Sequence, residues 1–464
     1  MLSSLPFTLP ALRTAYAAGA RPAEIVEEVF ARLEAAADPG IFLHADRAAA
    51  LAGARALGAP LGRPLWGMPF AVKDNIDVAG QPTTAACPAS AHVATEDAAV
   101  VARLRAAGAI VIGKTNLDQF ATGLVGTRTP YPVPRNALDP AIVPGGSSSG
   151  SALAVARGIV PFALGTDTAG SGRVPAAHNG IAGLKPSLGA WSTRGLVPAC
   201  RTLDTLSVFA QSTADAWEIH CAAAGYDPAD SFSRRFPVPP AEPGALRPGL
   251  CIALPDADSL AAHCEPRQIR MLEETAGRLR ALGARIVRIG FGPFHEVARL
   301  PYERSWVAER AAAIGDRLAE APETLLPVIR RIAGGAAQFS AVDAFRDRYR
   351  LAELRRACET AMAGCDLICV PSIPAFVTLA EDAADPVGPN ARLGSYTNFV
   401  NLLDLCGIAV PVGPRGDGRP GGVTLLAPAG RDALAASAAA AIEAGPLGAT
   451  GWPRPAAAAL RAAE

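Results

Sequence analysis

The segments GGSSSG (residues 145–150) and GTDTAGSGR (residues 165–173) flank a short apolar run. Glycine and serine at this density do not build a packed core, and they are typical of backbone that turns sharply close to a small molecule. The run between them predicts a helix over 151–157 and a strand over 159–164. A helix leads away from one edge of a sheet and the next strand returns to it, so both segments are expected at the same edge. We interpret this edge as the active site.

The composition is that of a globular protein with a large core. Of the 464 residues, 50% are hydrophobic and 19% are charged, and the formal net charge is zero. A zero net charge argues against nucleic acid or an anionic membrane surface as the main partner. No apolar stretch is long and uncharged enough to predict membrane insertion, and the N-terminal residues lack the basic region of a secretion signal. The nine scattered cysteines indicate a reducing cytoplasm.

The first half of the chain alternates helices with short apolar runs. Residues 8–60 are predicted to be helical, and the run at 67–73 predicts a strand with Lys73 at its C-terminal end. A helix over 97–107 and a strand over 109–112 follow. This alternation predicts an α/β protein with a mixed, largely parallel central sheet that is covered by helices on both faces.

The second half is less distinctive. The predicted strands lie at 250–254, 284–289 and 367–371, and the predicted long helices at 266–282, 301–320, 341–363 and 432–444, the last an alanine-rich surface helix. Residues 212–248 predict a short helix and a proline-rich link. Because no repeat or long linker marks a boundary, we expect one domain over 1–464, with N-terminal helices (1–60), a catalytic core (61–210) and the remainder (211–464).

Three motifs suggest other chemistry, and physical arguments reject each of them. GAIVIGKT (108–115) matches the phosphate-loop pattern, but its β-branched residues favour an extended strand over a curled loop. Ser148 fits the nucleophile-elbow pattern, but the two prolines in 137–144 leave no strand before it. We therefore expect the nearby His178 to pack in the core. Cys365 and Cys369 are spaced i, i+4, as metal ligands can be, but the adjacent LICV run favours a buried strand, and no metal site is predicted.

A lysine is the alternative base for a serine nucleophile. Only three of the 43 basic residues are lysine, namely Lys73, Lys114 and Lys185. A lysine serves as a base near neutral pH only if its pKa falls by roughly three units from its reference value, which burial can achieve. The apolar residues before Lys73 supply that burial. Asp74 would oppose the shift, so its carboxylate is expected to point away from Lys73.

The second glycine–serine segment offers an oxyanion hole. Consecutive backbone N–H groups in a tight glycine turn can converge on a developing negative oxygen. The groups in question are those of Thr168, Ala169, Gly170 and Ser171. Asp167 and Arg173 flank the turn, and we expect them to pair and hold the loop.

These residues resemble the amidase signature family. The match comprises VKDN (72–75), GGSSSG (145–150), GTDTAGSGRVP (165–175) and GLKP (183–186), and it extends more loosely over nearly the whole chain. The resemblance implies Ser171 as the nucleophile, Ser147 as a bridging serine at a cis peptide bond, and Lys73 as the base. It implies structural roles for Lys114 and Lys185, and no metal or organic cofactor.

Within this family the chain most resembles the allophanate hydrolases. The segments that carry this likeness are 116–128, 192–204 and 302–310. The resemblance implies hydrolysis of the terminal amide of allophanate to ammonia and N-carboxycarbamate, in urea or cyanuric acid breakdown, with a homodimer as a possible assembly. The further C-terminal domain of full-length allophanate hydrolases is expected to be absent from these 464 residues.

The segment 302–310 also has a physical interpretation. Tyr302, Trp306 and Arg310 are spaced i, i+4, i+8, so in one continuous helix they would share a face. An arginine on an aromatic face can bind the carboxylate of a small amide substrate through two hydrogen bonds. The alternative is an arginine that extends along the helix to solvent. Two other functions remain open: a carboxybiuret, indole-acetamide or aryl-amide hydrolase, and the glutaminase subunit of a transamidase complex.

Overall fold

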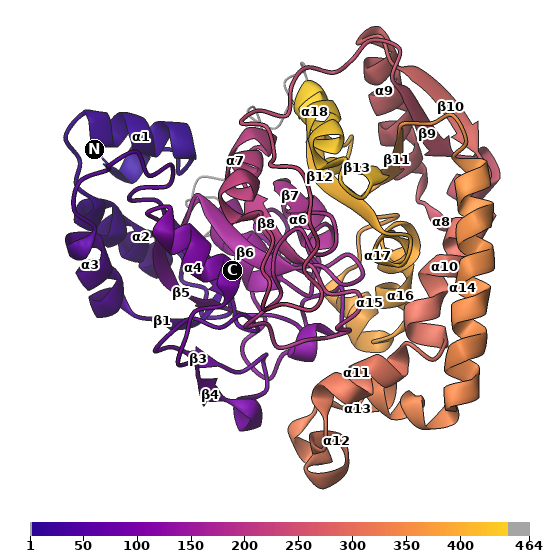
Figure 1. Ribbon diagram of the computed structural model, residues 1–464, viewed down its shortest axis with the longest axis horizontal. Coiled ribbons are helices and arrows are strands. Elements are labelled where there is room, and N and C mark those ends of the chain that lie inside the picture. Colours follow the sequence, from indigo (N-terminus) through magenta and orange to yellow (C-terminus); the bar gives the residue numbers. More distant parts are fainter. Residues whose placement is uncertain (1, 444–464) are drawn as a thin grey trace.

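The computed structural model describes residues 2–443, and a single large sheet organises them (Figure 1). In spatial order its eleven strands are β1 (Phe42–Ala45), β5 (Ile110–Thr115), β2 (Pro69–Lys73), β6 (Phe162–Thr166), β8 (Leu206–Ala210), β7 (Ala182–Lys185), β12 (Leu405–Pro414), β13 (Pro420–Pro428), β11 (Leu367–Pro371), β9 (Cys251–Pro255) and β10 (Arg285–Ile289). A separate two-stranded sheet pairs β3 (Pro82–Thr83) with β4 (His92–Val93).

Helices flank this sheet, as the sequence predicts. They are α1 (Leu9–Ala17), α2 (Pro22–Ala36), α3 (Arg47–Ala56), α4 (Ala99–Ala106), α5 (Ser149–Ala156), α6 (Val174–Asn179), α7 (Thr213–Ala223), α8 (Ala257–His263), α9 (Pro266–Ala281), α10 (Gly292–Glu303), α11 (Val307–Ile314), α12 (Arg317–Glu320), α13 (Pro327–Gly334), α14 (Ala341–Ala361), α15 (Leu379–Ala384), α16 (Gly388–Leu393), α17 (Phe399–Leu402) and α18 (Asp432–Glu443). The predicted mixed α/β fold is confirmed.

The sheet contains two groups of parallel strands with antiparallel strands between them. β2 pairs in parallel with β5 and β6 at one end, and β9 pairs in parallel with β11 and β10 at the other. All residues of β2 and β6 are buried, which explains why both strands are apolar throughout and do not alternate with polar residues. Because the two strands are parallel, Lys73 and the segment after β6 lie at the same edge, as expected.

Three sequence predictions about the elements are wrong. Residues 42–45, predicted to be helical, form the edge strand β1 antiparallel to β5. The predicted helix 301–320 is interrupted: α10 ends at Glu303, Arg304 is extended, and the N–H of Ser305 donates to Asp347 Oδ2 at 2.9 Å. The helix 432–444 is predicted at the surface, but most of α18 is buried against β12 and β13. Its small alanines allow this close packing. Ala444 lies outside the described residues.

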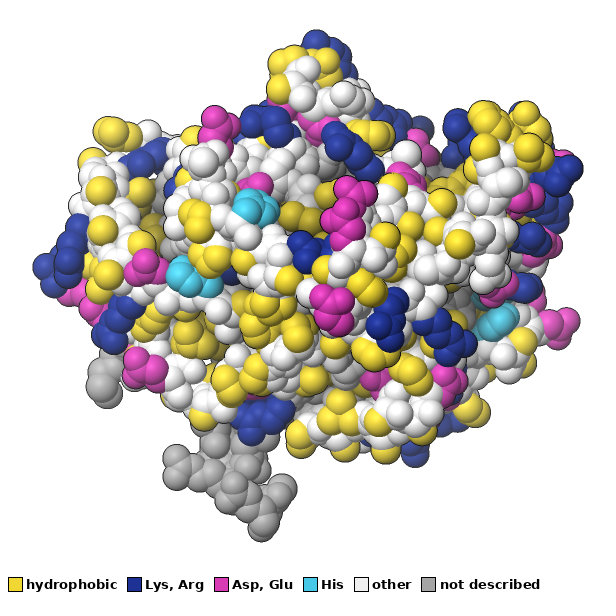
Figure 2. All heavy atoms as spheres, turned by 90° about the horizontal axis from the view of Figure 1, so that it is seen from below, with side chains coloured by type: hydrophobic (Ala, Val, Ile, Leu, Met, Phe, Trp, Pro, Cys, Tyr) yellow, Lys and Arg dark blue, Asp and Glu magenta, His cyan; other side chains and the backbone are white. Residues whose placement is uncertain are grey.

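Side chains of both charges are mixed over the face seen in Figure 2, in keeping with the balanced composition. Among residues 2–443, no helix has the length and apolarity needed to cross a membrane. The same residues contain no cluster of histidine, cysteine and acidic side chains that could hold a metal ion.

Candidate active site

Lys73 lies at the end of β2 in a fully buried environment. Its Nζ donates hydrogen bonds to Ser147 Oγ at 2.7 Å and to Thr166 Oγ1 at 2.6 Å. Burial lowers the pKa of Lys73 to about 7, although three nearby aspartates oppose the shift. At neutral pH a substantial fraction of this amine is therefore unprotonated and able to accept a proton.

The carboxylate of Asp74 points away from Lys73, as predicted. It forms an ion pair with Lys114, whose Nζ lies 3.3 Å from Asp74 Oδ1, and it accepts a hydrogen bond from the N–H of Thr84 at 3.0 Å. Lys114 also donates to Thr83 Oγ1 at 2.8 Å. Lys185 Nζ donates to the carbonyl of Pro186 at 2.8 Å. Neither Lys114 nor Lys185 forms a hydrogen bond with Ser147 or Ser171 among the described residues.

Ser147 is held in a tightly packed loop before α5. The predicted cis peptide bond is present, between Gly146 and Ser147. A Cβ atom on Gly146 would lie 2.1 Å from Asp118 Oδ2, so only glycine fits at this position. The carbonyl of Ser147 accepts a hydrogen bond from the N–H of Asp118 at 3.0 Å. Asp118 thus packs beside the bridging serine, a contact that the sequence pattern did not indicate.

Ser171 lies in the turn after β6, close to a different partner from the expected one. Its hydroxyl donates to the carbonyl of Gly123 at 3.4 Å. The hydroxyls of Ser147 and Ser171 form no hydrogen bond with each other in the described part of the chain. The structure therefore contains the contact between Lys73 and Ser147 but not the next contact of the expected relay.

The backbone N–H groups of residues 168–171 are free. None of them donates a hydrogen bond to another residue in the range 2–443. Gly170 has a φ of +142°, and a Cβ atom there would lie 2.5 Å from Thr397 Oγ1. Buried backbone donors without a protein partner are uncommon, and in a tight turn they suit a ligand that carries negative charge.

Two buried aspartates hold this turn. Arg173 donates to both carboxylate oxygens of Asp167, at 2.8 and 2.9 Å, which confirms the predicted pair. Asp204, which the sequence analysis did not single out, accepts a hydrogen bond from Thr168 Oγ1 at 2.6 Å. Burial raises the pKa of Asp204 to about 6.

Arg310 is buried, so the alternative of an arginine that reaches solvent is wrong. Only 1% of its surface is exposed. Its Nη1 donates to Thr122 Oγ1 and its Nη2 to Tyr302 Oη, both at 3.2 Å, and the guanidinium carbon lies 4.7 Å from the centre of the Tyr302 ring. Because the chain breaks between α10 and α11, Tyr302 and Arg310 meet by packing between two helices and not along one helix face. Trp306 packs against the main hydrophobic core.

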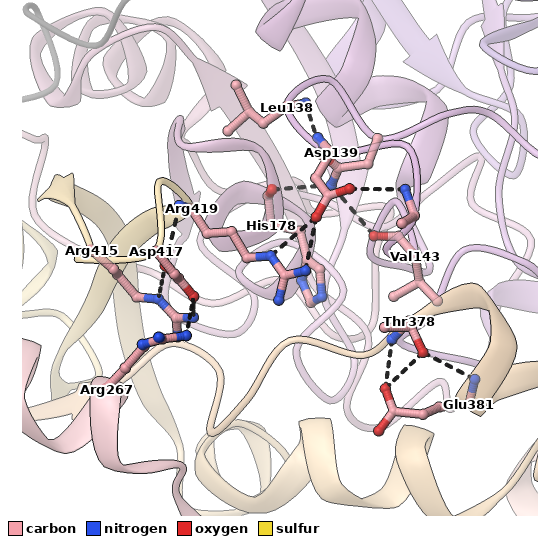
Figure 3. A network of polar contacts seen from close by, with 12 residues as sticks. Leu138, Asp139, Val143, His178, Arg267, Thr378, Glu381, Arg415, Asp417 and Arg419 are labelled. Carbon is pink, nitrogen blue, oxygen red and sulfur yellow. Dashed lines mark hydrogen bonds and ion pairs between the residues drawn. The ribbon is translucent and has the colours of Figure 1, made fainter. Parts of the chain in front are cut away.

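The rejected motifs have structural roles. GKT at 113–115 belongs to strand β5, and Ser148 Oγ donates to the carbonyl of Thr166 at 3.2 Å. His178 is fully buried next to the ion pair of Arg419 with Asp139 (Figure 3). Burial lowers the pKa of His178 to about 4, and its Nδ1 contacts the carbonyl of Val174 at 3.1 Å. The prediction that His178 packs in the core is confirmed.

One residue of the site, Thr166, could have been found from the pairing of the strands. Thr166 is the last residue of β6, and β6 lies beside β2 with Leu164 opposite Val72. A threonine at that position falls next to Lys73 once the two strands are known to be parallel. Gly123 and Thr122 lie in a loop without regular structure, and no periodic signal in the sequence marks them.

Comparison with known proteins gives the family of the chain. The model of the Amidase family matches residues 24–435. The urea amidolyase of Saccharomyces cerevisiae is 47% identical over 366 residues, which are 78% of this chain and 20% of that protein. A glutamyl-tRNA(Gln) amidotransferase subunit from Nitratidesulfovibrio vulgaris is 35% identical over 458 residues, which cover 90% of this chain and 92% of that protein.

A solved structure agrees with these relatives. The selenomethionine-substituted allophanate hydrolase of Kluyveromyces lactis superimposes with a TM-score of 0.87 at 40% identity, covering 94% of this chain and 72% of that one. The chain spans only 20% of the length of the urea amidolyases it matches. The matched range of the family model includes every residue of the site described above. The chain belongs to the amidase family.

Proposed function

We propose that this chain hydrolyses the terminal amide of allophanate, releasing ammonia and N-carboxycarbamate. The observation that carries the proposal is Arg310, a buried cation with no carboxylate within 4.0 Å in residues 2–443, near the candidate nucleophile. Arg310 donates a hydrogen bond to Thr122. The next residue, Gly123, has a carbonyl that accepts a hydrogen bond from the hydroxyl of Ser171. A buried arginine without an acidic partner is suited to a substrate carboxylate. The likeness to urea amidolyase and to allophanate hydrolase supports the same substrate.

The proposed chemistry uses an acyl-enzyme. Unprotonated Lys73 takes the proton of Ser147, and Ser147 takes that of Ser171 as the Ser171 oxygen attacks the amide carbonyl. The free N–H groups of residues 168–171 stabilise the oxyanion. The C–N bond then breaks, and the leaving nitrogen takes a proton back through Ser147, so that ammonia departs. Water hydrolyses the resulting ester by the same proton route.

Two further features belong to this proposal. The nine cysteines are all unpaired, which supports a reducing compartment such as the cytoplasm, where urea or cyanuric acid breakdown would supply the substrate. The helix α14, at the outer edge of the molecule in Figure 1, exposes Val342, Phe345 and Tyr349 on one side, which supports a homodimer through that face. Light scattering of the purified chain tests the dimer, and a Phe345→Glu, Tyr349→Glu variant should be monomeric.

Substitution of Arg310 tests the substrate. In Arg310→Gln we expect kcat/KM for allophanate to fall by about 10²-fold or more, because a charged pair in the buried site is lost. A neutral amide such as propionamide, which has no carboxylate, should be affected much less. Equal losses for both amides would show that Arg310 only supports the fold, and the proposal of allophanate would then fail.

The second candidate function is the glutaminase subunit of a transamidase. It is favoured by the nearly full-length match to a glutamyl-tRNA(Gln) amidotransferase subunit. Other amides, namely carboxybiuret and aryl or indole acetamides, are alternatives within the same chemistry. Ammonia release by the isolated chain from a panel of allophanate, biuret, malonamate, indole-acetamide and glutamine distinguishes all of these. Release from glutamine alone would favour the transamidase role.

A further inference from the structure

A cavity adjoins Arg310 through a shared side chain, that of Tyr302. It has a volume of about 320 Å³, and Tyr302 on α10, Arg331 on α13, Asn390 on α16 and the loop residue Arg128 lie in its wall. Tyr302 is also the residue whose hydroxyl accepts the hydrogen bond from Arg310. The cavity is therefore a neighbour of the candidate active site and is formed by helices that the catalytic motifs do not include.

The two arginines of this cavity lack acidic partners. Among residues 2–443, no carboxylate oxygen lies within 4.0 Å of the guanidinium of Arg128 or Arg331. Arg128 is only 4% exposed and donates to the carbonyls of Thr122 and Pro386, at 3.0 and 2.5 Å. Its Nε is buried and has no hydrogen-bond partner. This Nε is shielded from a ligand, but the positive charge of the guanidinium favours an anion in the adjacent cavity.

The acidic residues nearby are bonded to other groups. Asp118 accepts hydrogen bonds from two backbone N–H groups of its own loop, at 3.1 and 2.9 Å. Asp382 accepts a hydrogen bond from the hydroxyl of Thr127 at 2.5 Å. Glu303, which also lines the cavity, forms an ion pair with Arg299 at 2.8 Å. The carboxylate of Asp385 accepts the N–H of Val387 at 2.9 Å, and its pKa is lowered by backbone hydrogen bonds and by the charge of Arg331. No carboxylate of residues 2–443 forms an ion pair with either arginine, and the charged residues of the wall are two arginines and one glutamate.

Asn390 adds neutral donors. Its side-chain oxygen accepts the N–H of Leu124 at 2.7 Å, which fixes the orientation of the amide. Its Nδ2 donates to no residue of the described chain, so two N–H donors remain available at the cavity wall. Leu124 directly follows Gly123, and the amide therefore connects the cavity wall to the loop that contacts Ser171.

We propose that this cavity binds a small organic carboxylate. A carboxylate can accept two hydrogen bonds from a guanidinium and further ones from a side-chain amide, which matches the donors of Arg331 and Asn390 beside the buried charge of Arg128. The cavity volume suits a ligand of a few heavy atoms with some water. The ligand has two possible sources: the substrate or product of the adjacent site, or a separate carboxylate that acts from this position. Only the first of these rests on the proposed function.

Protection from chemical modification tests the binding without turnover. Phenylglyoxal modifies exposed arginines, and Arg331 and its neighbour Arg330 are both exposed on α13, but only Arg331 lines the cavity. We expect malonate, a stable dicarboxylate, to slow the modification of Arg331 several-fold in peptide-resolved mass spectrometry while Arg330 reacts unchanged. Equal rates at Arg331 with and without malonate would overturn the proposal, whether or not allophanate is the substrate.

The variant Asn390→Asp provides a matched test of the same cavity. The new carboxylate can still accept the N–H of Leu124, but it removes the two amide donors and adds a negative charge to the wall. Protection of Arg331 by malonate should therefore disappear in this variant. Undiminished protection in a folded Asn390→Asp protein would contradict the assigned site.

Kinetics distinguish the two sources of the ligand. If the substrate passes through the cavity, Arg331→Gln should lower kcat/KM for allophanate several-fold but not that for a neutral amide, and Arg330→Gln should change neither. If malonate protects Arg331 while both variants turn over allophanate normally, the cavity holds a separate carboxylate and the binding assignment stands.

Discussion

The Nζ atom of Lys73 lies 2.7 Å from the hydroxyl oxygen of Ser147, and no carboxylate lies within 4.0 Å of that nitrogen in residues 2–443. This arrangement combines a proton acceptor with the group that is to lose its proton. Burial supplies the lowered pKa, and the absence of an ion pair at Lys73 preserves it.

The pH dependence of catalysis follows from this pKa. Since the base must be unprotonated and its pKa is lowered to about 7, kcat/KM should rise as the pH is raised through about 7 and then level off. Ammonia release measured from pH 5 to 9 checks this. A profile that rises only near pH 10 would mean that Lys73 keeps an ordinary pKa and is not the base.

The same group makes folding stability depend on pH. Between pH 7 and the ordinary lysine pKa of 10.5, Lys73 is mainly unprotonated in the folded protein and protonated in the unfolded chain. Its contribution to the free energy of unfolding should therefore rise with pH in this window, by about 1.4 kcal/mol per pH unit. Urea unfolding at several pH values measures the free energy of unfolding of the wild type and of Lys73→Met. Plotted against pH, the difference between the two proteins should rise with this slope. A difference that does not change with pH would contradict the lowered pKa.

Serine substitutions separate the relay from the rejected nucleophile elbow. Ser171→Ala should abolish ammonia release, and Ser147→Ala should reduce it by about 10³-fold or more, because the proton then has no route to Lys73. Ser148→Ala is the control. The hydroxyl of Ser148 forms hydrogen bonds only with the backbone of Thr166, so this variant should keep most of the activity. Inactivity of a folded Ser148→Ala protein would reopen the elbow interpretation.

Thr166 is predicted to position the base. Its Oγ1 accepts a hydrogen bond from Lys73 at 2.6 Å, and a valine has nearly the same shape without the acceptor. Loss of this acceptor should destabilise the protonated amine, so in Thr166→Val the acidic limb of kcat/KM should move to lower pH. We also expect kcat to fall about tenfold because the amine is less well oriented. An unshifted limb in an equally stable variant would leave Thr166 with a structural role alone.

The sequence allowed the catalytic edge to be predicted because its signals are local. The apolar runs that become β2 and β6, and the glycines that close the turns after them, mark strand ends without reference to the rest of the chain. The direction of the two strands then places Lys73 and Ser171 together. Strands β12 and β13 were not predicted, because prolines and glycines within 405–428 obscure the strand pattern.

The features that the sequence did not predict depend on tertiary contacts. The break after α10 coincides with a hydrogen bond from Ser305 to Asp347, which lies on another helix. The partner of Ser171 is the carbonyl of Gly123, a backbone group that any residue would supply. Helical periodicity therefore favoured one continuous helix through Tyr302 and Arg310, whereas the two residues meet across a turn.

The ion pair of Asp74 with Lys114 bears on how far the enzyme tolerates change outside its motifs. Asp74 is paired with Lys114, while burial keeps the pKa of Lys73 low. Burial raises the pKa of the Asp74 carboxyl and the charge of Lys114 opposes this, so replacement of Lys114 would favour the neutral form of Asp74. No negative charge would then be left beside the base, and the pH optimum would stay where it is. Natural drift or engineering at Lys114 would thus act on the stability of the fold and not on the working pH of the enzyme.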